Sequence, residues 1–150
     1  MKNIHIVASI VGLSLLFAAC AGTVGAPTLS PAGTEISPAA GGTQTSEGGQ
    51  VTVVATWNGA AAGAVFDIKL DTHSMNLDAL DLSNAVLRND RGQTLTALPW
   101  TATKGGHHRE GTLRFGGDAA TLLAGAKWIE LILAGVGDIA ERTLRWEIGS

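Results

Sequence analysis

The sequence predicts an all-β fold, a β-sandwich that occupies residues 50–150. Two observations support this prediction. Short runs alternate between apolar and polar side chains, as in Val65–Leu70, where Phe66, Ile68 and Leu70 share one face of a strand, because side chains in a strand repeat with a period of two. Turn-forming glycine, asparagine and aspartate residues separate these runs. We therefore expect each run to be a strand with one face turned towards a core.

Seven such runs follow one another between Gln50 and the end of the chain. They are residues 51–57, 65–70, 84–88, 93–100, 111–115, 127–133 and 142–148. Seven short strands within about 100 residues are typical of a seven-stranded immunoglobulin/fibronectin-III-like β-sandwich. Between the strands, we expect residues 119–126 to form a helical turn or a crossover loop, and residues 77–82 to form a short helical turn.

Residues 1–19 have the composition of a signal peptide. Lys2 is followed by an apolar run from Ile4 to Phe17, which is short for a membrane span of roughly 20 residues and ends at small residues. The sequence Phe17-Ala18-Ala19-Cys20 resembles the lipobox of bacterial lipoproteins, with Phe17 where that family usually has leucine. The resemblance implies that Cys20, the only cysteine, is acylated, since two or more acyl chains anchor a protein stably. The alternative is an ordinary signal peptide with a chance cysteine near its end.

Residues 20–49 are predicted to form a disordered tether. They are almost entirely glycine, alanine, serine, threonine and proline, with Glu35 and Glu47 as the only charges, so they have little apolar surface to bury. The protein is then an extracytoplasmic lipoprotein attached to membrane lipid. Because Ala21 rather than aspartate follows Cys20, resemblance to the usual sorting rule implies the outer membrane in a diderm host, and otherwise the outer face of the cell membrane. With Cys20 acylated, no thiol remains for a disulfide.

Charge and motifs argue against several classes of function. Ten basic and thirteen acidic residues give a net charge of −3, without a cluster of lysine or arginine, and phosphate backbones are bound by clustered cations. Nucleic acid is therefore not an expected partner. Asp71, His73 and Ser74 have the residue types of a catalytic triad, but they lie too close in sequence to form its relay easily. No calcium loop or phosphate loop is present, and we expect no enzyme activity.

Three histidines predict a site for a transition metal. His73 follows the second predicted strand, and the pair His107-His108 follows Gly105-Gly106. Imidazole groups suit copper or zinc, and the two glycines would let the adjacent imidazoles leave strand geometry and converge. Met75 offers a thioether, and Asp71 is either a ligand or a group that orients an imidazole. The hypothesis is a copper or zinc site formed by His73, His107, His108, Asp71 and Met75; the alternative is that these are solvated loop residues.

The segments around these histidines resemble a pattern found in small, uncharacterised extracytoplasmic β domains of prokaryotes. The resemblance rests on residues 70–74, 105–115 and 141–146. It implies a shared type of domain, in which the three histidines occur together, and no known activity. The sequence thus leaves two hypotheses: a membrane-anchored metal-binding module, and a non-catalytic structural or protein-interaction module of the cell envelope.

The four tryptophans lie in or beside predicted strands. Packing in the core or at the sheet edge is expected for Trp57, Trp128 and Trp146, and an exposed cluster that stacks on sugars is the alternative. Trp128 is the least settled of the three, because Ile129, Leu131 and Leu133 form the inward set of its strand.

Overall fold

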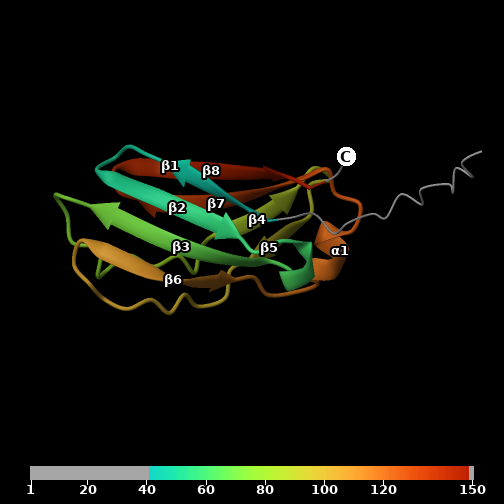
Figure 1. Ribbon diagram of the computed structural model, residues 1–150, viewed down its shortest axis with the longest axis horizontal. Helices are drawn as coiled ribbons and strands as arrows, with labels where there is room; N and C mark the ends of the chain where they lie inside the picture. The colour runs from blue at the N-terminus through green and yellow to red at the C-terminus, as the bar shows by residue number, and fades with distance from the viewer. Residues whose placement is uncertain (1–40, 149–150) are drawn as a thin grey trace, which may run out of the picture. The chain divides into compact units, whose positions relative to one another are not determined.

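The computed structural model describes residues 41–148, which form two four-stranded antiparallel sheets (Figure 1). Sheet A has the strand order β1-β2-β3-β6, with β1 at Gly42–Ser46, β2 at Val51–Trp57, β3 at Val65–Thr72 and β6 at His108–Arg114. Sheet B has the order β5-β4-β7-β8, with β5 at Thr94–Thr96, β4 at Val86–Asn89, β7 at Trp128–Val136 and β8 at Ile139–Glu147. The only helices in this part of the chain are η1 at Ala60–Ala62 and α1 at Ala119–Leu123. The prediction of an all-β fold is confirmed.

The core lies between the two sheets and follows from the alternation of apolar residues. Phe66, Ile68 and Leu70 of β3 are buried, while the residues between them are exposed. Sheet B contributes the inward set of β7 together with Leu144 and Trp146. The rings of Phe66 and Trp146 meet across the sheets with 5.2 Å between their centroids, so each sheet covers the apolar face of the other.

One strand was not expected from the sequence. Each of the seven predicted runs contains a strand, but β1 lies at Gly42–Ser46, in residues that were predicted to belong to the tether. Its ladder with β2 extends from Gly42 opposite Trp57 to Ser46 opposite Val53. The sandwich therefore begins before Gln50 and has eight strands within residues 41–148. Residues 119–126 contain the short helix α1, and residues 77–82 contain a turn closed from Leu80 N–H to the Leu77 carbonyl, with no helix.

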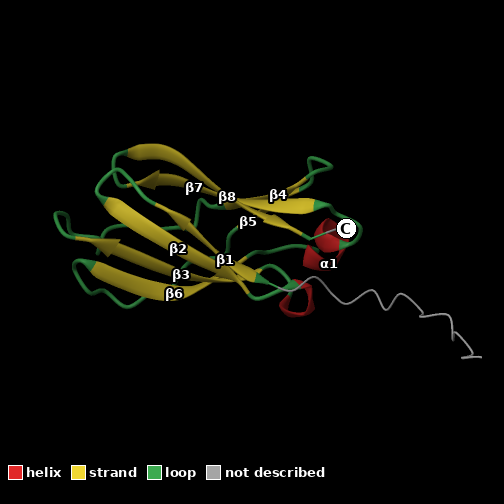
Figure 2. Ribbon diagram, turned by 45° about the horizontal axis from the view of Figure 1, so that its top comes forward, coloured by secondary structure: helices red, strands yellow, loops and turns green. Residues whose placement is uncertain are grey.

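The described part of the chain has two distinct ends (Figures 1 and 2). At the entry end, the chain enters β1 next to η1, α1 and the end of β8. At the opposite end, which we call the histidine end, lie the β1–β2 turn, the β7–β8 turn, the loop after β3 and the loop before β6. Gly137 allows two of these turns to touch, because its φ is +65° and a Cβ there would lie 2.1 Å from the carbonyl oxygen of Gly49.

The predicted signal peptide, Cys20 and most of the predicted tether lie outside the described residues. Within residues 41–148, no helix has the length and apolar character that a membrane crossing needs.

Candidate functional site

The two histidine-bearing loops meet at the histidine end. The N–H of Thr72 donates to the carbonyl of His107 over 3.0 Å, and the N–H of Leu77 donates to the carbonyl of Gly106 over 2.7 Å. The carboxylate of Asp78 accepts from the N–H groups of Gly105 and Gly106, at 3.0 and 3.1 Å. Main-chain hydrogen bonds thus fix the loop after β3 against the loop before β6, in an arrangement that a φ of +63° at Gly106 permits.

A buried arginine supports these loops from below. Arg109 of β6 donates to the carbonyls of Leu77 and Leu80 from Nη1, and to that of Ala102 from Nη2 at 3.3 Å. Its guanidinium carbon lies 4.6 Å from the ring centroid of the buried Trp100, at a distance typical of a cation–π contact. The loops of the histidine end are therefore held by a cation that has several main-chain partners.

The imidazoles of His107 and His108 do not converge. Asp71 and His108 are opposite each other in the β3–β6 ladder, and Nδ1 of His108 lies 2.5 Å from Oδ1 of Asp71. His107 lies in the turn just before β6, and its Nδ1 lies 2.9 Å from the carbonyl oxygen of Met75. The two rings are therefore held by different partners, one by Asp71 of β3 and the other by the loop after β3.

Met75 and His73, two other predicted ligands, do not complete a metal cluster. Met75 packs against the core and offers its carbonyl, not its sulfur, to His107. His73 is exposed just beyond the end of β3. Within residues 41–148, no three histidine, cysteine, aspartate or glutamate side chains are grouped so that they could hold a metal ion. The structure therefore does not group the three predicted imidazoles, and the two neighbouring histidines are held by different partners.

A shallow hollow of about 220 Å³ lies beside the Asp71–His108 pair. Its walls are the outer side of β3 and β6 and the loop at Thr103–Gly105, and its charged residues are Lys69, Asp71, Lys104, His108, Arg109 and Glu110. Lys69 and Glu110 form an exposed ion pair with 3.8 Å between Nζ and Oε2. The lining includes both basic and acidic side chains, so the hollow favours no single sign of charge.

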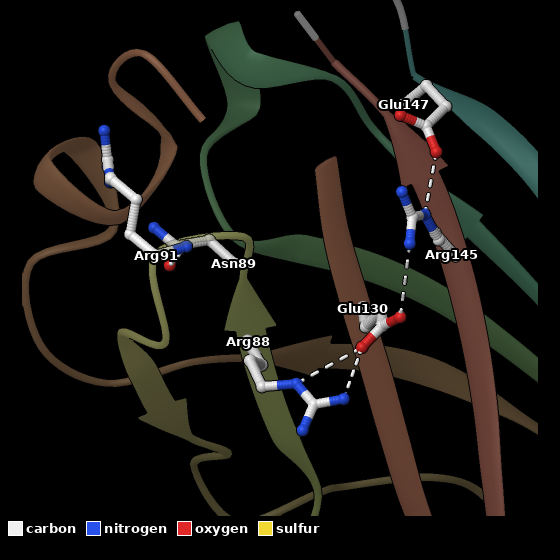
Figure 3. Close-up of polar contacts among 6 residues, drawn as sticks. All are labelled: Arg88, Asn89, Arg91, Glu130, Arg145 and Glu147. Atoms are coloured by element: carbon white, nitrogen blue, oxygen red, sulfur yellow. Dashed lines mark hydrogen bonds and ion pairs between the residues drawn. The ribbon is translucent and has the colours of Figure 1, made fainter. Parts of the chain in front are cut away.

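A second cluster lies on the outer face of sheet B, where Figure 3 shows a chain of arginine and glutamate side chains. Arg88 of β4 donates from Nε and Nη2 to Oε2 of Glu130 on β7, at 3.2 and 2.6 Å. Arg145 of β8 lies 3.8 Å from Oε1 of Glu130, and its Nε donates to Glu147 over 2.7 Å. We call these four residues the arginine–glutamate row. The side chain of Glu130 is only 12% exposed, because the two arginines cover it.

Trp128 lies at one side of this row. The guanidinium carbon of Arg145 is 4.3 Å from its ring centroid, and the tryptophan is half-buried. On the other side of the row, Val86 and Ile132 are opposite each other and are also half-buried. The outer face of sheet B thus carries half-buried aromatic and aliphatic side chains beside the arginine–glutamate row, whose charged groups contact one another.

The tryptophans differ in burial. Trp57, Trp100 and Trp146 are buried in the core, and Trp128 is half-buried on the outer face of β7, where it packs against Arg145. An exposed cluster of tryptophans for sugar stacking is therefore not formed.

The arginine–glutamate row was not predicted from the sequence. The alternation in residues 127–133 and 142–148 does place Trp128, Arg145 and Glu147 on outward positions. The missing information was register: only the ladder shows that Glu130 is opposite Arg145 on one side and Arg88 on the other.

Neighbouring polar residues secure α1 and have a structural role (Figure 3). Nδ2 of Asn89 donates to the carbonyl of Leu122 over 2.8 Å, and Nη1 of Arg91 donates to that of Ala124 over 2.8 Å. At the other end of the helix, hydrogen bonds from Thr121 lower the pKa of Asp118.

Hydrogen bonds from Ser83 lower the pKa of Asp81 in the same way, because they stabilise the charged carboxylate.

Comparison with known proteins found no match for this chain. No family model matches the chain, and neither a curated protein nor a solved structure matches it. A function has to be argued from the residues themselves.

Proposed function

We propose that this protein is a lipid-anchored, extracytoplasmic module that binds a protein partner of the cell envelope through the outer face of sheet B. The signal-peptide pattern that ends at Cys20 supports export and acylation, which would place the domain at the outer membrane of a diderm host or at the outer face of a single cell membrane. The chain enters the sandwich at the end opposite the histidine end. An anchor at Cys20 would therefore leave both the histidine end and the face of sheet B accessible.

An immunoglobulin-like arrangement is part of this proposal. If β2 to β8 are taken as strands A, B, C, C′, E, F and G, the sheets have the orders A-B-E and C′-C-F-G, and the strands that share a sheet are those of immunoglobulin-like sandwiches. The strand β1 would then be an addition at the N-terminal side of strand A. Domains of this architecture commonly serve as cell-surface modules, which fits a role in binding.

The observation that carries the proposal is the Trp128–Arg145 contact. Tryptophan and arginine are enriched among the residues that dominate binding energy at protein interfaces. Here Nε of Arg145 donates to Glu147 and its Nη1 lies 3.8 Å from Glu130, which restricts the side chain before it binds. Val86 and Ile132 add apolar surface next to the row. The patch is thus preorganised for a protein surface.

Site-specific photo-crosslinking in cells tests this function. A photoreactive p-benzoylphenylalanine placed at Thr143, which is exposed on β8, should form a covalent product of defined mass. The same group at Thr45, exposed on β1 of the other sheet, should not form that product. The substitution Trp128→Ala should remove the Thr143 product while the protein stays folded by circular dichroism. Equal products from both positions, or a product that Trp128→Ala leaves unchanged, would rule out this face as the binding surface.

The anchor is tested separately. Cys20→Ala should abolish incorporation of radiolabelled palmitate and release the protein from the membrane fraction. Labelling that persists in Cys20→Ala would show that the resemblance to a lipobox is misleading.

Metal capture is a second candidate function, favoured by one observation. Metal-binding histidines usually have one ring nitrogen held by an oxygen acceptor while the other binds the ion. His108 has this arrangement, because Asp71 holds its Nδ1 and leaves Nε2 for a ligand. We propose copper or zinc as the ion, with His73 as the second imidazole and Asp71 as the orienting group rather than a ligand.

A further inference from the structure

The outer face of the β7–β8 hairpin carries residues that complement one another across the two strands. Glu130 is opposite Arg145, Ile132 is opposite Thr143 and Trp128 is opposite Glu147. The acidic member of the central pair retains an unused acceptor. Both hydrogen bonds from Arg88 go to Oε2 of Glu130, and Nη1 of Arg145 lies 3.8 Å from Oε1, which is beyond hydrogen-bond distance.

Such a hairpin is complementary to itself. Two copies could meet face to face through their hairpins, related by a two-fold axis in the plane between them. The axis would run parallel to the strands and lie midway between β7 and β8. This axis exchanges the positions of the two strands, so each residue of β7 faces its own ladder partner from the second copy. Glu130 then faces Arg145 of the second copy, and the symmetry of the axis repeats that pair once more. Ile132 and Thr143 are brought together in the same way.

We infer that the partner of this face is a second copy of the same chain, packed through the β7–β8 hairpin with Glu130 and Arg145 in reciprocal pairs. The inference rests on the proposed function and names its partner. It gives Oε1 of Glu130, which accepts no side-chain hydrogen bond within residues 41–148, a second arginine as a partner. It also covers the half-buried Trp128 and Ile132 on both copies.

The same axis suits two copies that are anchored in one membrane. Rotation about an axis parallel to the strands leaves the direction of the strands unchanged. The entry ends of both copies therefore point the same way, and both tethers would run towards the same bilayer. An axis perpendicular to the strands would point the two entry ends in opposite directions, so anchoring favours the first arrangement.

The size of the face indicates that anchoring is needed for pairing. A nine-residue strand such as β7 is about 30 Å long, and three strands are about 15 Å across, which gives on the order of 450 Å² per copy. A stable protein complex commonly buries about 800 Å² per partner. The dimer should thus be weak in solution, and confinement to one membrane raises the effective concentration that drives it.

Energy transfer between anchored copies tests the inference. The chain from Cys20 onwards, fused at Ser150 to a donor or an acceptor fluorescent protein, is coupled through its only cysteine to a maleimide lipid in phosphatidylcholine vesicles. Wild-type copies should show energy transfer above the value for randomly distributed molecules at the same surface density. Arg145→Glu and Glu130→Lys should each reduce transfer to that random value. Lys69→Glu, a matched charge reversal on the outer face of sheet A, should leave it unchanged.

Mixing the two charge-reversal variants gives the decisive result. Donor-labelled Arg145→Glu and acceptor-labelled Glu130→Lys restore both opposite-charge pairs between copies, so transfer should return. A misfolded variant would not be rescued by mixing, and Glu130→Gln, which keeps the size of the side chain, provides a milder test if Glu130→Lys does not fold. Random transfer by the wild type, or no recovery on mixing folded variants, would overturn the inference. Photo-crosslinking from Thr143 to a different protein would then leave the proposed function standing without self-association.

Discussion

Arg142 of β8 donates a hydrogen bond of 2.9 Å to the carbonyl of Ser46 at the end of β1, 96 residues earlier in the chain. Arg142 is buried, and it also donates to the carbonyls of Gly48, Val51 and Val136. Burial lowers the pKa of its guanidinium, and the carbonyl oxygens replace the water that the cation has lost. This arginine attaches the β1–β2 turn of sheet A to sheet B.

The first prediction concerns this attachment. Arg142→Ala should lower the free energy of unfolding by about 3 kcal/mol, because it removes several hydrogen bonds from a buried charged group to main-chain carbonyls. Arg142→Lys should be intermediate, since an ammonium group has three donors and cannot reach all of the carbonyls. Urea denaturation measures both. Arg145→Ala, exposed on the same strand, is the control and should cost less than about 1 kcal/mol.

The second prediction compares two ion pairs. The Arg88–Glu130 pair has its carboxylate largely covered, whereas Lys69 and Glu110 are 64% and 74% exposed. Double-mutant cycles to alanine should give a coupling energy of about 1 kcal/mol for Arg88–Glu130 and close to zero for Lys69–Glu110. Equal coupling energies in the two cycles would contradict the view that the arginine–glutamate row is preorganised.

The third prediction concerns metal at the histidine end. Calorimetric titration with Cu²⁺ at neutral pH should show one weak site, which His108→Ala removes and His73→Ala weakens. His107→Ala should leave binding intact, because Nδ1 of His107 is engaged by the carbonyl of Met75 and not by Asp71. Absence of heat with both Cu²⁺ and Zn²⁺ would eliminate metal capture, and dependence on His107 would show that the two imidazoles can converge after all.

The strands that were predicted from the sequence are those in which apolar and polar residues alternate within the strand itself. Residues 65–70 and 142–148 show their alternation without reference to any partner, and the structure has strands at both places. The strand β1 has no such face, since its residues are glycine, threonine, glutamine and serine. Its position depends on Arg142 and on Trp146, whose Nε1 donates to the carbonyl of Gly42. Contacts between residues about 100 positions apart are not visible in a local pattern.

Register explains what could not be predicted about the candidate sites. The direction of successive strands is enough to bring His73 and His108 to one end. Whether the rings of His107 and His108 meet depends on the partners that they find, which are the carbonyl of Met75 for His107 and Asp71 for His108. The arginine–glutamate row depends on register in the same way, because its members come from three strands.

The last prediction uses the helix α1 to separate charge from hydrogen bonding. Asp118 accepts from the N–H of Thr121 at 3.0 Å and from its hydroxyl at 2.5 Å, as an N-cap residue does. Its pKa in the folded state is lowered, chiefly by the side-chain hydrogen bond from Thr121. A lowered pKa means that the carboxylate stabilises the fold above its unfolded pKa of about 3.9, and that this stabilisation is lost as pH falls through the folded value.

Asp118→Ala should therefore be less stable than the wild type at pH 7, by a margin that stays constant to about pH 5 and closes as the pH is lowered below about 4. Urea midpoints measured from pH 7 to pH 2 give that margin. Asp118→Asn is the matched control, because it keeps an acceptor for the Thr121 N–H and cannot ionise, so its margin should be smaller and should close over the same range. A margin for Asp118→Ala that stays constant into acid would show that the uncharged hydrogen bonds, and not the carboxylate charge, hold the start of α1.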